Sequence, residues 1–489
     1  MKLPILNTLV AKLPRPTVSA ITLNLAVALF VMAIYNNTFW QRGLQIFDGH
    51  LFPLAVFGAA VWALTLLIIT LFGFRWLQKP VLVFVLILSA VTSYYMDTLG
   101  VMIDRDMIQN AMTTTFAESK HLMTFRFISH VALFGILPAL IVLWVKVRPQ
   151  RLWRNIWTWA LTSAVAAGLF VGLLLSNFQT YSAVIREHKE LAGSYQPGAP
   201  LAGAFKYAKM MLKSRNLVVA PLGLDAKKGP QLAAATKPVL TVIVAGETAR
   251  AQNFSLNGYA RDTNPELAKR DVIFFHDVSS CGTATATSLP CMFSHFTRGE
   301  YSYDKGVSNE NLLDVMTHAG VMVEWWDNNT GYKDIASRVP SRVLNTLKNP
   351  DFCANGECDD GIFLGFLQET AAKMTEDTVI VMHQIGSHGP AYHVRYPDTY
   401  DVFQPSCQTG EFKDCSTEEI TNAYDNTIAY TDHILAQTID FLDSQDRVLP
   451  SLIYASDHGE SLGEKGLFLH GAPYFMAPEF QTKVPMLIW

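Results

Sequence analysis

The chain has 489 residues and a formal net charge of -4, from 38 Lys and Arg against 42 Asp and Glu. Half of the residues are hydrophobic and only 16% are charged, whereas roughly 25% are charged in an ordinary soluble domain. This composition excludes a disordered chain. The near-balanced charge also excludes a typical nucleic-acid-binding domain, which is clearly basic. The apolar excess lies in the amino-terminal part, and most of the charge follows it.

Five amino-terminal segments contain no Asp, Glu, Lys or Arg, namely 16–41, 49–74, 80–96, 127–145 and 155–185. A helix needs about 20 apolar residues to cross roughly 30 Å of hydrocarbon, and only the third segment is slightly short. Local thinning of the bilayer would accommodate it. Five such runs are too many for the buried helices of a soluble protein. The first run is also too long for a cleavable signal peptide. We therefore predict a membrane domain of five transmembrane helices over 1–185.

Basic residues in the short loops predict the orientation of these helices. One side has no acidic residue and carries Lys2, Lys12, Arg15, Arg75, Lys79, Lys146, Arg148, Arg151 and Arg154. The other side mixes Arg42, Arg105, Lys120 and Arg126 with Asp48, Asp97, Asp104, Asp106 and Glu118. We expect the first side to be cytoplasmic. An odd number of spans then places the rest of the chain outside the cytoplasm.

All six cysteines lie in this exported part, in three couples that are close in sequence. We predict the disulfides Cys281–Cys291, Cys353–Cys358 and Cys407–Cys415, which would persist in an oxidising compartment. A cysteine-rich metal site is the alternative, but the CxxC spacing that it usually shows is absent.

Residues 186–237 are expected to form a connector, with a basic amphipathic stretch around 205–212 that either follows the membrane surface or packs as an ordinary helix. From residue 238 to 489, β-branched runs alternate with helical stretches, which predicts a mainly parallel sheet covered by helices. The expected strands are 238–246, 321–326, 377–384, 451–457 and 484–489. Because the chain ends within the last of these, we expect the catalytic domain to be truncated at its carboxyl end.

Polar residues follow three of the predicted strands: Glu247 in VAGETAR, His388 in GSHGP, and Asp457-His458 in SDHGE. The carboxyl ends of parallel strands are where open α/β sheets bind ligands. Carboxylate and imidazole groups are the usual ligands of zinc. A single Asp-His-Gly is more often a capped turn, but three such strand ends together predict a metal site.

The segment CGTATATSLPC supplies small hydroxyl residues at the expected start of a helix, where unpaired backbone N–H groups favour a phosphate. A hydroxyl bound directly to zinc would become a nucleophile. Thr283, Thr285, Thr287 and Ser288 all satisfy this chemistry, and a simple helix cap is the alternative interpretation.

Several long motifs resemble the membrane-anchored phosphoethanolamine transferases that modify lipid A, a family that includes the mobile colistin-resistance enzymes. These motifs include VAGETARAQNFSLNGY, SCGTATATSLPCMFS, WWDNNTGYK, HQIGSHGPAYHVRYP and SDHGESLGEKGLFLHGAPY. The resemblance implies an α/β/α alkaline-phosphatase-like (sulfatase-like) periplasmic domain and zinc-dependent transfer through a covalent intermediate. It implies that Thr285 is the nucleophile and that the principal zinc is bound by Glu247, Thr285, Asp457 and His458. Lys333, His388, His470 and the less well matched Asn329 would hold the phosphoryl group or a second, weaker zinc ion.

In the membrane half, IDRDMIQNAMTTTFAES resembles the family's substrate-binding loop, with Asn110, Thr114 and Glu118 at its polar positions. Their spacing of four places them on one face of a short helix. A solvated helical face is the alternative. The chain departs from the family at its end, since family members continue past 484–489 with a further His-Asp motif and helices.

The resemblance further implies a monomeric enzyme of the bacterial inner membrane, with phosphatidylethanolamine as donor, lipid A as acceptor and polymyxin resistance as phenotype. Kdo or a core heptose is the alternative acceptor. A phosphoglycerol transferase or sulfatase on the same scaffold is a further alternative, but a sulfatase's C/S-x-P-x-R motif is absent from the nucleophile segment. A transporter or membrane scaffold is disfavoured because the five uncharged segments lack the intramembrane charges that a transporter uses.

Overall fold

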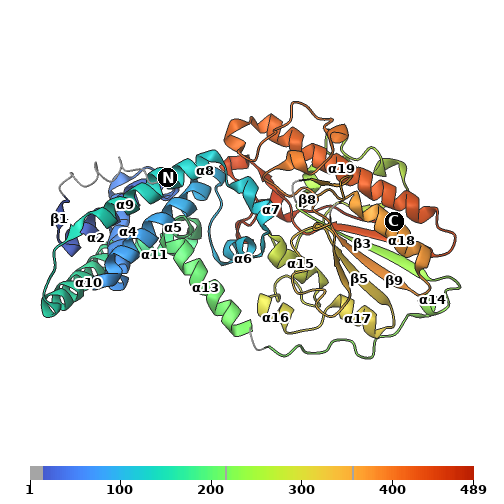
Figure 1. The fold of residues 1–489 in the computed structure, drawn as a ribbon, viewed down its shortest axis with the longest axis horizontal. Helices are drawn as coiled ribbons and strands as arrows, with labels where there is room; N and C mark the ends of the chain where they lie inside the picture. Colours follow the sequence, from blue (N-terminus) through green and yellow to red (C-terminus); the bar gives the residue numbers. More distant parts are fainter. Residues whose placement is uncertain (1–14, 215–216, 348, 355–356) are drawn as a thin grey trace, which may run out of the picture. The chain divides into compact units, whose positions relative to one another are not determined.

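The structure is a computed structural model that describes residues 15–214, 217–347, 349–354 and 357–489, without the side chains of 117 and 118 (Figure 1). The chain divides into two compact units. The first contains the described residues up to Asp104 and Phe125–Ala202. The second contains Arg105–Thr124 and Gly203–Trp489, so the segment that follows the third span belongs with the carboxyl-terminal part. The exact division into membrane domain, connector and catalytic domain stays a prediction.

The first unit is helical, with α2 Ala20–Ile34, α3 Asn37–Ile46, α4 Leu51–Phe72, α5 Gln78–Leu99, α8 Phe125–His130, α9 Leu137–Trp144, α10 Leu152–Leu175, α11 Phe178–Glu187 and α12 Lys189–Gly193. Four described segments are long and apolar enough to cross a membrane: Leu51–Phe72, Arg75–Leu99, Phe125–Trp144 and Leu152–Leu175. The pair α2 and α3, bent by 64°, makes a fifth if it is one span. The predicted helical membrane part is therefore confirmed, with four spans or five.

Three details of the predicted spans differ from the structure. The third helix, α5, has 22 residues and needs no thinning of the bilayer, because it continues through the charged residues that bounded the predicted segment. Lys79 donates to the carbonyl of Leu143 at 2.8 Å, and Asp97 accepts from the backbone N–H of Thr38 at 3.2 Å. The uncharged run 155–185 divides into α10 and α11, and the run 16–41 bends after Ile34.

The second unit begins with two short helices, α6 Arg105–Thr113 and α7 Phe116–Ser119. The predicted single helix carrying Asn110, Thr114 and Glu118 is therefore wrong, since Thr114 lies between the two helices. The hydroxyl groups of Thr113 and Thr114 donate to carbonyls one turn earlier, at 3.1 and 2.7 Å. Threonine side chains that bond to the backbone in this way compete with helix continuation, which explains the break.

The connector contains α13 Gly198–Ser214 and α14 Pro230–Ala233. In α13, Phe205 and Leu212 are 72% and 70% exposed, whereas Met210 is only 9% exposed. The helix thus has an exposed apolar side in addition to a packed one, and its placement along a membrane surface stays a prediction.

The core of the second unit is a seven-stranded sheet in the order β4-β13-β10-β3-β9-β5-β6. Its strands are β3 Val239–Gly246, β4 Ile273–Phe275, β5 Met322–Asp327, β6 Ser341–Val343, β9 Thr378–His383, β10 Leu449–Ser456 and β13 Met486–Ile488. The strands from β10 to β6 are parallel, as predicted, and β13 and β4 form an antiparallel edge. All five predicted strands are present.

Helices cover both faces of this sheet (Figure 1). The helices α15 Thr285–Phe293 and α17 Leu312–His318 lie on one face, and α18 Ile362–Lys373 and α19 Thr417–Asp443 lie on the other. Two adjacent residues of β5 illustrate the alternation, because Trp325 contacts Phe293 of α15 while Trp326 contacts Phe366 of α18. Successive side chains of a strand point to opposite faces, so a strand covered on both faces is apolar throughout.

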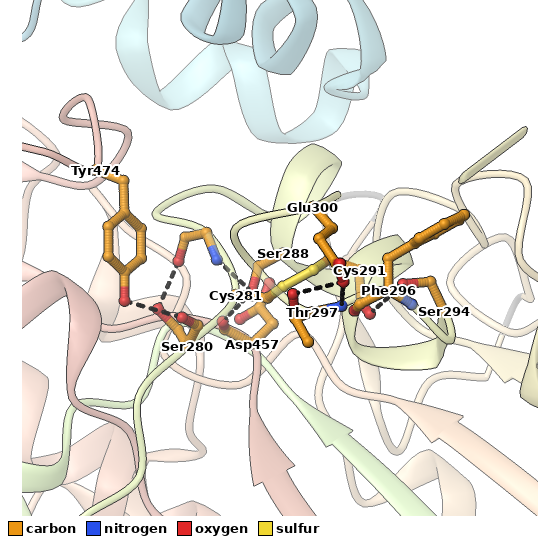
Figure 2. Close-up of a disulfide and its surroundings, with 11 residues drawn as sticks. Ser280, Cys281, Ser288, Cys291, Ser294, Phe296, Thr297, Glu300, Asp457 and Tyr474 are labelled. Carbon is orange, nitrogen blue, oxygen red and sulfur yellow. Dashed lines mark hydrogen bonds between the residues drawn. A yellow bond between two sulfur atoms is a disulfide. The ribbon is translucent and has the colours of Figure 1, made fainter. Parts of the chain in front are cut away.

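Short elements and disulfides complete the unit, with β7 Cys353–Ala354, β8 Glu357–Cys358, α16 Tyr303–Val307, β11 Ser461–Leu462, β12 Phe468–Leu469 and α20 Glu479–Thr482. The three predicted disulfides, Cys281–Cys291, Cys353–Cys358 and Cys407–Cys415, are all present. The first closes the loop that leads into α15 (Figure 2). Within this loop the Ser288 hydroxyl donates to the carbonyl of Asp457 at 2.5 Å, which joins the start of α15 to the end of β10.

Asp360 joins the loops that follow β5 and β9. Its fully buried carboxylate accepts from the backbone N–H groups of Ile385 and Gly386, both at 2.9 Å, and from the amide of Asn328 at 2.8 Å. These three bonds hold the two strand-end loops together behind the polar end of the sheet.

We predict that Asp360→Ala destabilises the protein by about 3 kcal/mol, because three buried donors lose their acceptor. Thermal unfolding of the full chain in detergent should show a midpoint lowered by roughly 6 to 12 °C. The exposed Asp351→Ala should leave the midpoint unchanged. Equal midpoints for the Asp360 variant and the wild type would contradict the assigned role.

Candidate metal and nucleophile site

The register of the parallel sheet brings several polar residues to one edge. Gly246 pairs with Ser456, so that the residues after them, Glu247 and Asp457, leave neighbouring strands at the same level. On the other side of β3, His383 at the end of β9 pairs with Ala245. The predicted convergence of polar side chains at the carboxyl ends of the strands is therefore present.

Glu247, Asp457 and His458 form a group in which one ligand atom from each lies within 4.8 Å of the others. His458 Nε2 is 3.4 Å from Glu247 Oε1 and 3.5 Å from Asp457 Oδ2. All three side chains are fully buried. A buried cluster of two carboxylates and one imidazole is the kind of ligand set that zinc prefers.

The hydrogen bonds of this group leave the inward-facing atoms available to a cation. His458 Nδ1 lies 2.9 Å from the carbonyl of Gly459 and donates to it, so that the other ring nitrogen, Nε2, faces the two carboxylates. Asp457 Oδ1 accepts from the backbone N–H groups of Thr248 and His458, at 3.2 and 2.7 Å. Asp457 Oδ2 is buried and has no hydrogen-bond partner among the described residues. The residues present therefore fit a bound metal ion.

Charge inside the group also favours a cation. Burial raises the pKa of Asp457, and the neighbouring negative charge of Glu247 raises it further. Burial also raises the pKa of Glu247, but the facing imidazoles of His458, His388 and His383 and the hydroxyl of Thr248 outweigh burial, so its pKa lies below the ordinary value. Two carboxylates so close together repel each other strongly in a dry site, and a divalent cation removes this cost.

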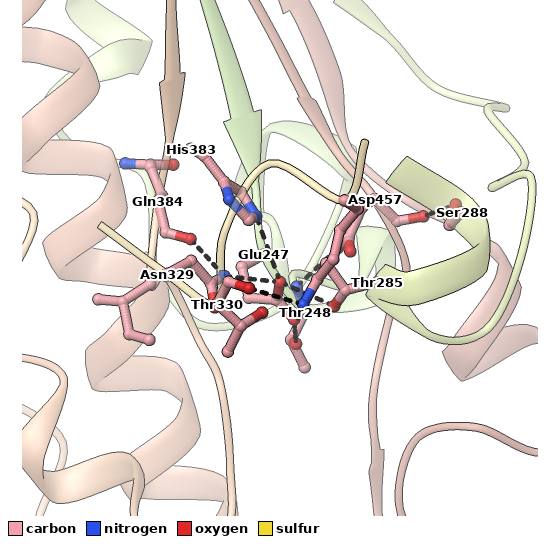
Figure 3. A network of polar contacts seen from close by, with 12 residues as sticks. Glu247, Thr248, Thr285, Ser288, Asn329, Thr330, His383, Gln384 and Asp457 are labelled. Atoms are coloured by element: carbon pink, nitrogen blue, oxygen red, sulfur yellow. Dashed lines mark hydrogen bonds and ion pairs between the residues drawn. The ribbon is translucent and has the colours of Figure 1, made fainter. Parts of the chain in front are cut away.

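The Thr285 hydroxyl lies directly against this group (Figure 3). Thr285 is the first residue of α15, and its hydroxyl oxygen is 3.0 and 3.2 Å from the two carboxylate oxygens of Glu247 and 3.3 Å from His458 Nε2. Two rival hydroxyls of the segment are bonded elsewhere, since Thr283 donates to the carbonyl of Ala472 and Ser288 to that of Asp457.

Backbone geometry around the group is tight. Gly459 follows His458, and a Cβ there would lie 2.0 Å from the carbonyl oxygen of Phe480, so only glycine fits. Thr248, which follows Glu247, has a φ of +58°, an uncommon value for a β-branched residue. The Tyr424 hydroxyl donates to the Thr248 carbonyl at 2.8 Å, and this bond helps to hold the strained backbone.

A second layer of predicted residues lies around the group. The amide of Asn329 donates to Glu247 Oε2 at 2.8 Å. The His470 ring centre is 4.4 Å from that of His458 and 5.4 Å from that of His388. Lys333 donates to the carbonyl of Thr330 at 2.8 Å, and its amino group is 3.4 Å from the carbonyl of Thr113. Asn329 and the two histidines thus join the site, whereas the contacts described for Lys333 lead toward α6.

The loop over 105–124 packs within the second unit by several side chains. The amide of Gln109 approaches the carbonyl of Ala286 in α15 at 3.4 Å. His121 bonds to Glu357 at 2.8 Å, and the Thr124 hydroxyl donates to Glu411 at 2.8 Å. Asn110 and Thr114 lie in this loop, Thr114 with its hydroxyl on the carbonyl of Asn110, and the side chain of Glu118 lies outside the described residues.

Two residues at the strand ends were missed by the sequence analysis. His383 Nδ1 bonds to Asp327 Oδ2 at 3.0 Å, and its other nitrogen, Nε2, is buried 4.0 Å from Glu247 Oε2 (Figure 3). A carboxylate that fixes a histidine toward a metal group is a recurring feature of metal sites. The signal was present in the sequence, since His383 is the last residue but one of the predicted strand 377–384 and Asp327 directly follows 321–326.

Comparison with known proteins agrees with this geometry. Residues 61–212 match the family described as phosphoethanolamine transferase EptA/EptB, and residues 240–489 match the sulfatase family. Phosphoethanolamine transferase EptA of Escherichia coli K12 is 38% identical over 490 residues, covering 98% of this chain and 88% of the relative. The chain belongs to the phosphoethanolamine transferase family.

Two further similarities support this membership. Phosphatidylethanolamine transferase Mcr-1 of Escherichia coli is 38% identical over 97% of this chain and 90% of its own length. The structure of the integral membrane lipooligosaccharide phosphoethanolamine transferase A of Neisseria meningitidis superposes with a TM-score of 0.93 at 33% identity, covering 97% of this chain and 89% of that one. The protein is thus a membrane enzyme whose carboxyl-terminal part has the sulfatase and alkaline-phosphatase fold, as predicted.

Removing one carboxylate of the group should remove its metal. We predict that Glu247→Gln purified from cells grown with zinc retains little bound zinc, because one of two anionic ligands is lost. Elemental analysis by plasma mass spectrometry gives the zinc content per chain. The exposed Glu479→Gln should retain the wild-type content, and a Glu247 variant with wild-type content would remove Glu247 from the ligand set.

Proposed function

We propose that this phosphoethanolamine transferase moves phosphoethanolamine from phosphatidylethanolamine to a phosphate of lipid A, with Thr285 as nucleophile and zinc as cofactor. The observation that carries the proposal is the position of the Thr285 hydroxyl, within 3.3 Å of both Glu247 and His458 in a fully buried group. The arrangement brings the hydroxyl of Thr285, at the start of a helix, against a set of zinc-type ligands.

The names of relatives support the two substrates. Mcr-1 is named a phosphatidylethanolamine transferase, and the Neisseria enzyme a lipooligosaccharide phosphoethanolamine transferase. A Kdo(2)-lipid A phosphoethanolamine 7''-transferase of Escherichia coli K12 is less similar, at 29% identity over 83% of this chain. The greater similarity to the EptA and Mcr proteins favours a lipid A phosphate over the Kdo sugar as acceptor.

Zinc would be held by Glu247, Asp457, His458 and the oxygen of Thr285. When bound, the ion lowers the pKa of a coordinated hydroxyl and neutralises negative charge on the transferred group. Two observations support this assignment: Asp457 Oδ2 has no hydrogen-bond partner among the described residues, and His458 Nε2 faces both carboxylates. His388 and His470, whose rings are 5.4 Å apart, would hold the phosphoryl group or a second, weaker zinc ion.

In the first half-reaction, Thr285 Oγ1 attacks the phosphorus of phosphatidylethanolamine, and the bond from phosphorus to the diacylglycerol oxygen breaks. The proton that Thr285 loses balances the proton that diacylglycerol gains. The enzyme then carries phosphoethanolamine on Thr285 as a phosphodiester. Backbone N–H groups at the start of α15 and the side chains of Lys333 and His470 would stabilise the charge on the nonbridging oxygens.

In the second half-reaction, a phosphate oxygen of lipid A attacks the same phosphorus atom, and the bond to Thr285 Oγ1 breaks. The product is lipid A carrying phosphoethanolamine, and the free enzyme is restored, which is a ping-pong scheme. The added ammonium would reduce the attraction of lipid A for cationic peptides, hence the expected polymyxin resistance.

The membrane part has a physical role in this scheme. Both substrates keep their acyl chains in the bilayer, and extraction would cost about 0.8 kcal/mol for each CH₂ exposed to water. Spans that anchor the enzyme in the same bilayer remove the need for extraction. The basic end of the spans supports a cytoplasmic position for that end, and we expect the catalytic part on the periplasmic side of the inner membrane.

Thr285→Ala should abolish transfer, by at least about 1000-fold, because the acceptor hydroxyl of the covalent step is gone. Mass spectrometry of lipid A from cells that make the variant measures the modification. Thr285→Ser should retain measurable transfer, and Thr287→Ala should be active. Full modification of lipid A by the Thr285→Ala protein would show that another group is the nucleophile.

Metal removal is an independent test. Purified enzyme that has been treated exhaustively with a chelator should no longer remove the headgroup from a fluorescent phosphatidylethanolamine. Added zinc should restore this activity. The metal content is measured in the same samples. A metal-free sample with undiminished activity would contradict the role of zinc but not that of Thr285.

A further inference from the structure

The first unit contains a cavity of about 300 Å³ at one end of its helical bundle. The walls come from the start of α2, the end of α4, the turn into α5, the segment after α9 and the start of α10. Beside it, β1 Thr17–Val18 pairs with β2 Lys146–Val147, and Val147 itself lines the cavity. Because every lining residue belongs to the first unit, the cavity shares none with the Glu247 group.

This end of the bundle is strongly basic. Its described segments 15–19, 73–79 and 145–154 contain no Asp or Glu but carry Arg15, Arg75, Lys79, Lys146, Arg148, Arg151 and Arg154. Two of these, Arg75 and Arg148, line the cavity and are exposed. A concave site with cationic groups at its opening concentrates anions, and basic pockets between spans bind anionic headgroups.

The interior of the cavity is polar but neutral. Asn24, Thr70 and Gln78 are at most 4% exposed and bond to one another, with Asn24 Nδ2 to Thr70 Oγ1 at 3.2 Å and Gln78 Nε2 to Asn24 Oδ1 at 2.8 Å. None of the residues that line the cavity is acidic. The cavity therefore offers no carboxylate to pair with an ammonium group, while its two arginines would pair with a phosphate, so it suits an anionic headgroup better than a zwitterionic one.

Aromatic side chains at the rim favour a lipid over a soluble anion. Trp76 is 80% exposed, and the Arg75 guanidinium lies 4.3 Å above its ring. Trp159 lines the cavity and donates to the carbonyl of Thr70 at 2.8 Å. Exposed Trp residues at the ends of spans mark the level of the lipid headgroups. The backbone of Arg75 has a φ of +49°, a strained value of the kind that recurs at ligand sites.

We propose that this cavity binds the headgroup of an anionic phospholipid of the phosphatidylglycerol type. The phosphodiester would lie between Arg75 and Arg148, and the glycerol hydroxyls would reach Asn24, Thr70 and Gln78. The acyl chains would remain in the bilayer beside the exposed apolar side chains of this end, such as Phe72 and Trp76, which are 66% and 80% exposed. The site is independent of the transfer reaction.

Native mass spectrometry of the full chain in detergent tests this proposal with phosphatidylglycerol and phosphatidylcholine of matched acyl chains, because phosphatidylcholine is zwitterionic but is not the proposed donor. The wild type should retain phosphatidylglycerol with a preference of about tenfold or more, since each nearby arginine attracts the anion. Arg75→Gln combined with Arg148→Gln should bind the two lipids equally. Arg154→Gln, which removes a charge from the same end but not from the cavity lining, should keep the preference.

Two further arms keep the test decisive. Phosphatidylglycerol, but not phosphatidylcholine, should raise the thermal unfolding midpoint of the wild type, and this arm does not depend on the folding of any variant. Inorganic phosphate at the same concentration should not displace the lipid. Equal binding of both lipids by the wild type, an undiminished preference in the double variant, or displacement by inorganic phosphate would each overturn the proposal.

Discussion

The repulsion between two buried carboxylates is the constraint on which the catalytic part of this molecule depends. Glu247 and Asp457 follow adjacent parallel strands in register, and both side chains are fully buried. Two such charges about 5 Å apart repel by roughly 3 kcal/mol at an effective dielectric constant near 20, in addition to the cost of burial. A cation bound between the two carboxylates replaces their repulsion by attraction to the ion. The sheet register that brings the carboxylates together therefore also favours metal binding.

The surrounding bonds hold this group in place before any substrate arrives. The Glu247 carboxylate accepts from Asn329, Thr248 and Thr285, and Asp457 accepts from two backbone N–H groups. His383, itself bonded to Asp327, approaches Glu247 from a third strand. Ligands fixed by bonds to rigid strands and to α15 need little reorganisation when charge develops at the nucleophile, which is the property that makes such sites effective.

Much of this was accessible from the sequence, because the signals are local. Charge-free runs predict spans, β-branched runs predict buried strands, and cysteines close in sequence predicted all three disulfides. The missed features depend on long-range contacts: β13 and β4 pair antiparallel only through the assembled sheet, and His383 acquires its orientation from Asp327 on a neighbouring strand. The limits of α5 were missed for a related reason, since Lys79 is accommodated by carbonyls of a different span.

The bend between α2 and α3 shows how polar groups are accommodated in the helical first unit. Asn36 lies at the break between α2 and α3 and is fully buried. Its amide donates to the carbonyls of Val31 and Gln196, both at 3.0 Å, and its oxygen accepts from the backbone N–H of Gln196 at 2.8 Å. A helix can bend inside a bilayer only where side chains satisfy the freed backbone groups. Asn36 ties the bend to Gln196, and Asp97 accepts from the backbone N–H of Thr38 at the start of α3 at 3.2 Å. Side chains from the bend and from α5 therefore both fix this joint.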